Sequence, residues 1–137
     1  MSGSVPYYNG SSLVTGTAGT AGQVFVSQGT GAPAWQNAGL QIYAISSLVS
    51  TSPYVVGTEY FIPVDTSTTA ITVQLPNTPA TGQVFVVKDA SGNALSNNIT
   101  VTTVGGTDFI DGATSLAIAV NYQAVQFIFD GTKYYSF

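Results

Sequence analysis

Apolar residues that alternate with polar ones constrain this chain most, because a period of two is the signature of a strand with one buried face. The alternation runs through residues 71–75, 99–102 and 116–120. Residues 84–87 and 124–129 are instead apolar on both faces. Strands of that kind lie between two packed layers or against another subunit. The pattern therefore predicts strands throughout this part of the chain.

Turn-forming residues separate these runs. Glycine supplies positive φ angles, and Asn and Asp bond to their own backbone. Residues 127–135 carry the clearest hairpin signal, and residues 41–49 favour a strand over a short helix. The other turn signals are Pro76-Asn77, Ser91-Gly92-Asn93, Gly105-Gly106 and Asp111-Gly112. We therefore expect an all-β fold, an antiparallel β-sandwich that is jelly-roll-like, over residues 40–137.

Residues 1–39 differ in composition from the rest, because Gly, Ser, Thr and Ala dominate them. Residues 23–28 and 32–36 predict a short hairpin around the turn 29–31. Residues 15–22 are too small to bury a core alone, so they form either a flexible linker or a segment ordered against neighbouring subunits. The second outcome is favoured, because the apolar hairpin side chains need a place to bury. We expect an extended segment for attachment and oligomerisation.

The scarcity of charge excludes several classes of partner. Only 6% of the residues are charged, the net charge is −4, and the basic side chains are Lys88 and Lys133. A nucleic-acid partner is excluded, because phosphates need several Lys or Arg residues. No apolar run reaches the roughly 18 residues of a membrane span, so membrane insertion is not expected. The chain has no cysteine, and hence no disulfide framework.

Catalytic residue types are nearly absent. There is no His, so neither the commonest general base nor a serine triad is available. A glycosidase needs two carboxylates across a sugar-binding cleft, and Asp108 with Asp111 could share a Ca²⁺ ion with carbonyl oxygens. Turn formation is the favoured role of Asp89, Asp111 and Asp130. We predict no enzyme, and no catalytic, cofactor or metal site. The six acids are Glu59, Asp65, Asp89, Asp108, Asp111 and Asp130.

The aromatic residues have three interpretations. They could stack on sugars, they could form a protein interface, or they could pair within the core and across strands. Core and cross-strand packing is favoured for each residue. The set comprises Tyr7, Tyr8, Trp35, Tyr43, Tyr54, Tyr60, Tyr122, Tyr134 and Tyr135.

Two stretches of the chain carry a family resemblance. In residues 19–35 a Gly-Gln strand is followed by a Gly-Thr-Gly turn and a Pro-Ala-Trp strand. This stretch resembles a segment common in tail-fibre and other virion-surface proteins. The C-terminal half, about residues 69–137, is similar to a recurring C-terminal fibre domain. The motifs that carry this second resemblance are residues 71–76, 87–94, 98–101, 110–112 and 129–135.

The resemblance implies a trimeric virion fibre, spike or decoration protein with a β-sandwich head and no catalytic residues. We expect a structural component of the virion surface. Its residues 1–39 would join the homotrimer to other virion structural proteins, and a host surface glycan or protein would be its receptor. The receptor-binding residues are unknown. Two alternatives remain open: a carbohydrate-binding or lectin-like module of a cell-surface protein, and a polysaccharide-degrading spike.

Overall fold

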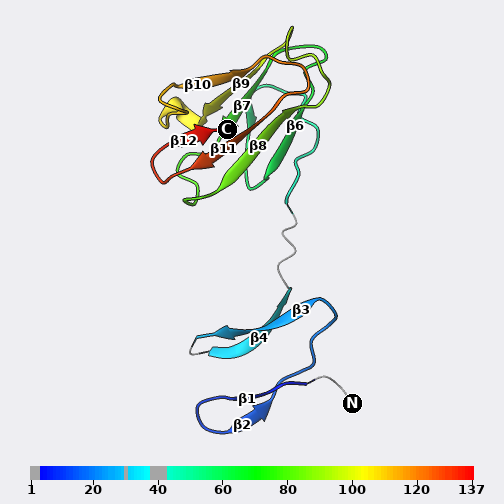
Figure 1. Ribbon diagram of the computed structural model, residues 1–137, viewed down its shortest axis with the longest axis vertical. Helices are drawn as coiled ribbons and strands as arrows, with labels where there is room; N and C mark the ends of the chain where they lie inside the picture. The colour runs from blue at the N-terminus through cyan, green and yellow to red at the C-terminus, as the bar shows by residue number, and fades with distance from the viewer. Residues whose placement is uncertain (1–3, 30, 38–42) are drawn as a thin grey trace. The chain divides into compact units, whose positions relative to one another are not determined.

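The computed structural model describes residues 4–29, 31–37 and 43–137, which fall into two compact units, Met1–Ile42 and Tyr43–Phe137 (Figure 1). The boundary expected between residues 39 and 40 lies outside the described residues. We call the first the N-terminal unit and the second the sandwich unit.

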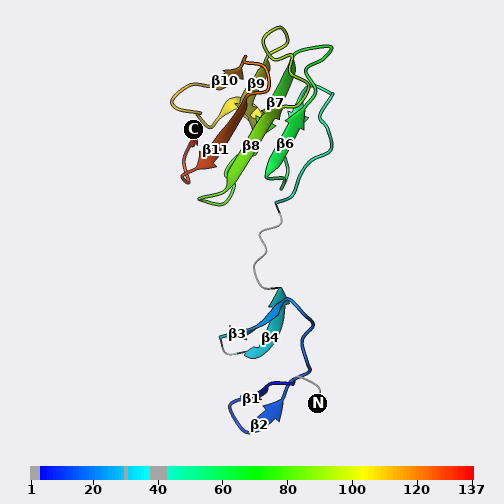
Figure 2. The ribbon, with the colours of Figure 1, turned by 45° about the vertical axis from the view of Figure 1, so that its right-hand side comes forward.

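The sandwich unit consists of two four-stranded sheets, with strand orders β10-β9-β7-β5 and β12-β11-β8-β6. The two sheets lie one in front of the other in Figures 1 and 2. A short 3-10 turn, Val104–Gly106, follows β9. The strands are β5 (Tyr54–Val55), β6 (Phe61–Val64), β7 (Ile71–Leu75), β8 (Val84–Asp89), β9 (Ile99–Thr103), β10 (Ser115–Ile118), β11 (Ala124–Phe129) and β12 (Tyr134–Ser136).

Alternate residues of both sheets meet in one core. In β7 and in β9, every second side chain is buried, as the alternation predicts. Tyr134 lies 5.0 Å from Phe129 and 6.2 Å from Phe85, measured between ring centroids. Its hydroxyl donates to the carbonyl oxygen of Pro76 at 2.7 Å, which satisfies the one polar atom of a fully buried ring. Burial, together with the charge of Asp108, raises the pKa of Tyr134.

The expected all-β sandwich is confirmed, and so is the hairpin in residues 127–135, in which Phe129 pairs with Tyr134. The sheets also contain parallel pairs, β5 with β7, β7 with β9, and β6 with β8. The reason is the path of the chain: from β6 to β9 it crosses between the sheets at every step, so successive strands within one sheet point the same way. The jelly-roll-like connectivity stays a prediction.

Residues 43–49 do not form the strand expected for residues 41–49, whose first two residues lie outside the described part. They make two isolated parallel bridges along the free edge of β6, from Ile45 to Phe61 and from Val49 to Val64. The carbonyl oxygen of Ala44 accepts from both Tyr60 and Phe61, which breaks the regular ladder.

The N-terminal unit contains two antiparallel hairpins. The expected one joins β3 (Gln23–Gln28) to β4 (Gly31–Asn37) and is confirmed. The sequence analysis missed the other, which joins β1 (Pro6–Tyr8) to β2 (Leu13–Thr15). Its signal was the Asn9-Gly10 pair. Asn9 Oδ1 accepts from the backbone N–H groups of the next two serines at 3.0 and 2.9 Å, and Gly10 has a φ of 95°.

A buried carboxylate holds the loops at the end of β8 together. Asp89 Oδ1 accepts from Thr66 Oγ1 at 2.7 Å and from the N–H of Gly92 at 3.0 Å. Its Oδ2 accepts from the N–H groups of Ala94 at 3.1 Å and Tyr122 at 2.9 Å. Desolvation alone would raise the pKa of Asp89, but these four donors outweigh it and lower the pKa to about 2.

Replacing this carboxylate tests its contribution. The change Asp89→Asn keeps the shape but turns one acceptor oxygen into a donor that faces N–H groups. We expect it to lower the free energy of unfolding by about 3 kcal/mol in denaturant titrations. Asp130→Asn is the control, because Asp130 is exposed and caps only its own turn, so its loss should be much smaller. Equal losses for the two variants would contradict the argument.

Acid should destabilise the sandwich unit in a defined window. The folded pKa of Asp89 lies below its ordinary 3.8, so the unfolded chain binds the proton first as the pH falls. The contribution of Asp89 to the free energy of unfolding is therefore fully present above about pH 4 and is lost as the pH falls to about 2. The N–H groups of Lys133 and Thr132 lower the pKa of Asp130, which acts in the same direction. Urea unfolding at several pH values measures this slope, which should flatten in Asp89→Asn.

Candidate interaction surfaces

The outer face of the β10-β9-β7-β5 sheet is mainly polar. The alternation that sends Ile71, Val73 and Leu75 into the core leaves Thr72 and Gln74 on the outside. In β9, Thr100 and Thr102 occupy the equivalent outward positions, and they lie opposite Thr72 and Gln74 in the register. A threonine-rich face of this kind suits contact with water.

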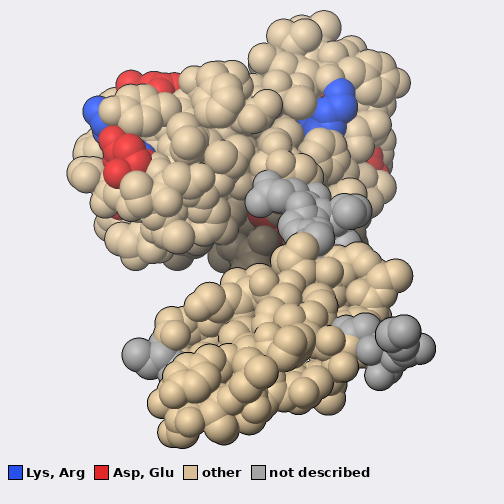
Figure 3. Space-filling model, turned by 60° about the horizontal axis from the view of Figure 1, so that its bottom comes forward, with Lys and Arg blue, Asp and Glu red and all other residues tan. Residues whose placement is uncertain are grey.

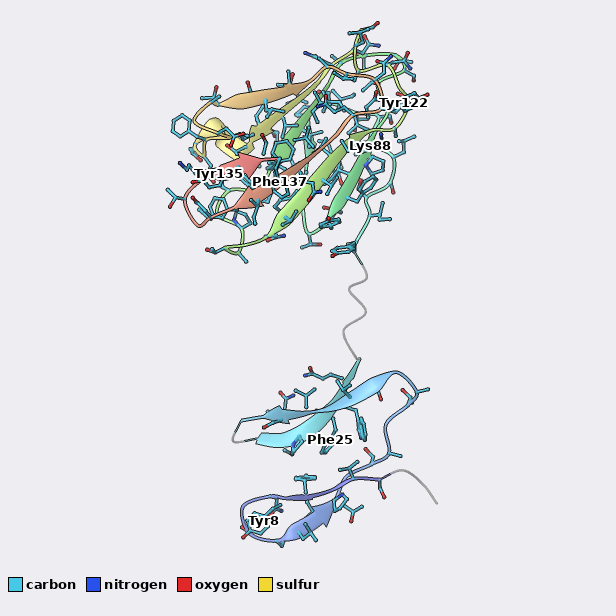
Figure 4. The ribbon with its side chains drawn as sticks, viewed as in Figure 1. Tyr8, Phe25, Lys88, Tyr122, Tyr135 and Phe137 are labelled. Atoms are coloured by element: carbon cyan, nitrogen blue, oxygen red, sulfur yellow. The ribbon has the colours of Figure 1, made fainter. Side chains whose placement is uncertain are left out.

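The outer face of the β12-β11-β8-β6 sheet has the opposite character. In its register, Ile128 pairs with Val84 and with Tyr135, while Val86 pairs with Phe61. Phe137 extends this face, because its backbone exchanges two 3.1 Å hydrogen bonds with Gln126. Figure 4 shows Tyr135 and Phe137 in and just after β12. We call this the apolar face: Ile45, Phe61, Pro63, Val84, Val86, Ala124, Ile128, Tyr135 and Phe137.

Two positions on that sheet surface, Gln126 and Lys88, are polar. Lys88 pairs with Ala124 and with Pro63 near the end of the strands. Its ammonium donates to the carbonyl oxygen of Tyr122 and lies 5.6 Å from the centroid of the same ring. The charge is therefore held at the rim of the sheet. Figure 3 shows how few charged groups one face of the protein carries among uncharged atoms.

Tyr122 forms an aromatic corner beside this rim. It has a φ of 59°, a left-handed conformation that is uncommon for a bulky residue, and its ring is 63% exposed. Asp89 fixes its backbone N–H, and the ring lies so close to Gly92 that a Cβ there would come within 2.2 Å of it. Figure 4 shows Tyr122 and Lys88 together at this end of the unit.

The N-terminal unit has an aromatic cluster of its own. Phe25 lies 4.9 Å from Trp35, its partner across the hairpin, and 6.2 Å from Tyr7 of the other hairpin, measured between ring centroids. Trp35 Nε1 donates to the carbonyl oxygen of Thr17 at 2.7 Å. A Cβ at Gly19 would lie 2.5 Å from the Trp35 ring, so only glycine fits there.

Two hollows border this cluster, and Tyr7 lines both of them. One, of about 390 Å³, is also lined by Tyr8 and Ala32. The other, of about 420 Å³, lies against Phe25 and Trp35. Neither residues 4–29 nor residues 31–36 include a buried side chain. The cluster is therefore half-exposed apolar surface and not a core.

The acids do not assemble into a site. Three of the carboxylates accept from donors near their own loops: Glu59 from Tyr54 and Gly57, Asp65 from Ser67, and Asp130 from Thr132 and Lys133. The pair considered for Ca²⁺ has separate partners, because Asp108 accepts from Thr78 whereas Asp111 accepts from Ser136. Within the described residues, no three His, Cys, Asp or Glu side chains gather in one place.

The aromatic set divides into buried, paired and exposed residues. Tyr134 belongs to the core, and Tyr54 is half-buried against Glu59. Tyr43 packs on Tyr60 at 4.0 Å between centroids. Tyr8, Tyr122 and Tyr135 are exposed. The sequence predicted a second apolar surface on β8 and β11, but not the part that β6 adds. Phe61 comes to lie beside Val86 only through the order of the strands in the sheet.

Comparison with known proteins gives no family. The chain matches no protein-family model, and no curated protein matches it. In the part of the chain that the structure describes, no helix is long and apolar enough to cross a membrane.

Proposed function

We propose that this protein is a structural component of a virion surface, a fibre, spike or decoration protein, and that it works as a homotrimer. The number of copies and the virion location come from the resemblance of residues 19–36 and 69–137. The case for more than one copy comes from the N-terminal unit. Contact with a host surface glycan or protein is part of this proposal, and its residues are unassigned.

One observation carries the proposal: the N-terminal unit has strands and aromatic residues but no buried side chain among residues 4–29 and 31–36. Two-stranded hairpins are marginally stable alone. Units below about 40 residues usually need disulfides, metals or oligomerisation. The chain has no cysteine, and no group of metal ligands lies in its described part. Association with other chains would bury Tyr7, Phe25 and Trp35 and stabilise the unit.

The charge distribution favours copies of the same chain as those partners. No charged side chain precedes Glu59 in the sequence. Copies that meet around a symmetry axis bring identical groups together, so any charge there would repel its own image. An uncharged unit avoids that cost, and it also offers no charge by which a different partner could be selected.

The mass of the protein in solution tests the proposal. Size exclusion coupled to light scattering at micromolar concentration should give three times the chain mass of 14.1 kDa. The mass should persist in high salt, because the N-terminal unit has no charged pairs to screen. A clean monomer would contradict the homotrimer.

A matched pair of glycine variants tests whether the aromatic cluster supports association. In Gly19→Ala the added methyl collides with the Trp35 ring, so we expect a smaller mass or dissociation at higher concentration than in the parent. Gly31→Ala is the control, because a Cβ there meets Gln28 at an ordinary 3.5 Å and the mass should not change. A smaller mass of the assembly in both variants, or an unchanged mass in both, would count against this role of the cluster.

A second candidate function is a carbohydrate-binding module, and Tyr122 is the observation that favours it. Its ring is exposed and rigidly held, and Asn121 lies beside it with Oδ1 bonded to the N–H of Leu95 at 2.8 Å. An aromatic face next to amides suits a sugar ring. A glycan array separates the candidates: sugar binding by a monomer that Tyr122→Ala abolishes would favour the module.

A further inference from the structure

We infer that the apolar face of the sandwich unit is a contact surface between copies of this chain, which bury it against one another. The inference rests on the proposed function, because it requires that copies associate. It goes beyond that proposal, which places the association in the N-terminal unit, by assigning a second contact between copies to the sandwich unit.

The contrast between the two sheets is the starting point. Both sheets send alternate residues into the same core, yet one presents threonines on its outer surface and the other presents Phe61, Ile128 and Phe137. On this face Ile45, Tyr135 and Phe137 are 67%, 42% and 68% exposed, whereas Val86 is buried within its own chain and Phe61, Val84 and Ile128 are half-buried. A difference between the two faces of one unit has no explanation in its own core, which is complete without the exposed side chains of either face. Exposed apolar side chains that gather on one face mark a candidate interaction site.

The charges indicate what covers this face. Lys88 and Lys133 are the charged residues beside the face, and the ammonium of each lies over an aromatic ring of its own chain, 5.6 Å from the ring centroid of Tyr122 and 5.0 Å from that of Tyr135. Two copies can therefore meet through Val84 and Ile128, in the middle of the face, while both ammonium groups keep these contacts at its edges.

The size of the face decides between a free partner and a tethered copy. β8 and β11 have six residues each, β6 has four and β12 has three, so strands about 4.8 Å apart give the four-stranded sheet a face of roughly 300 Å². A stable interface between free proteins needs roughly 800 Å² on each partner. The face is too small to capture a free partner firmly. Sandwich units held together through their N-terminal units meet at millimolar effective concentration, where a weak apolar contact is sufficient.

Single cysteines test the inference in the full chain, which contains none of its own. Gln126→Cys places a thiol on the surface of the β12-β11-β8-β6 sheet, and Thr100→Cys places one on the polar outer face of the other sheet. Both parent side chains are half-buried within their own chain. Maleimide labelling rates are measured on the assembled protein and divided by the rates in denaturant. Thermal unfolding and light scattering verify that each variant folds and assembles.

We expect the thiol of Gln126→Cys to react about tenfold more slowly than that of Thr100→Cys, the ratio for a face covered nine-tenths of the time. Equal rates in an assembled protein would overturn the inference and leave the proposed function intact. A monomeric protein would overturn both.

Discussion

One end of the sandwich depends on the hydrogen bonds that the carboxylate of Asp89 accepts. It stands at the end of β8 and receives hydrogen bonds from Thr66, from the loop after β8, and from Tyr122. These segments have no other common point of attachment as strong, because bonds to a charged acceptor are about twice as strong as neutral ones. The same carboxylate fixes the left-handed backbone of Tyr122 and therefore places its ring.

The fold gives the protein two kinds of uncovered apolar surface. One is the half-exposed aromatic cluster of the N-terminal unit around Phe25 and Trp35. The other is the apolar face of the sandwich unit. Elsewhere large apolar side chains such as Leu95, Phe109 and Val120 are exposed singly, and charged residues are few. A chain of this composition gains little from electrostatic recognition, so a partner would have to be recognised mainly through shape and apolar contact.

The sequence was sufficient for most strands of the sandwich unit but not for their arrangement. The alternation in residues 71–75 and 99–102 predicted which side chains are buried, because the period of a strand is a local property. The parallel pairing of β6 with β8 could not be predicted, since hairpins and crossovers use the same turn residues. Asp89 was predicted to be a turn residue, whereas it is the last residue of β8, and its burial depends on Thr66 and Tyr122, which are distant in the sequence. The apolar runs of β8 and β11 predicted only their own part of the apolar face.

The crossing path from β6 to β9 also affects how the sandwich unit can fold. The pairs β6 with β8 and β7 with β9 each form across a connection that contains a strand of the opposite sheet. Both sheets therefore depend on contacts between residues that are far apart in the sequence. Such topologies fold slowly and cooperatively. While the sheets form, the outward residues of β8 and β11 are exposed in each chain. Chains that are held close together would therefore fold with these residues near one another.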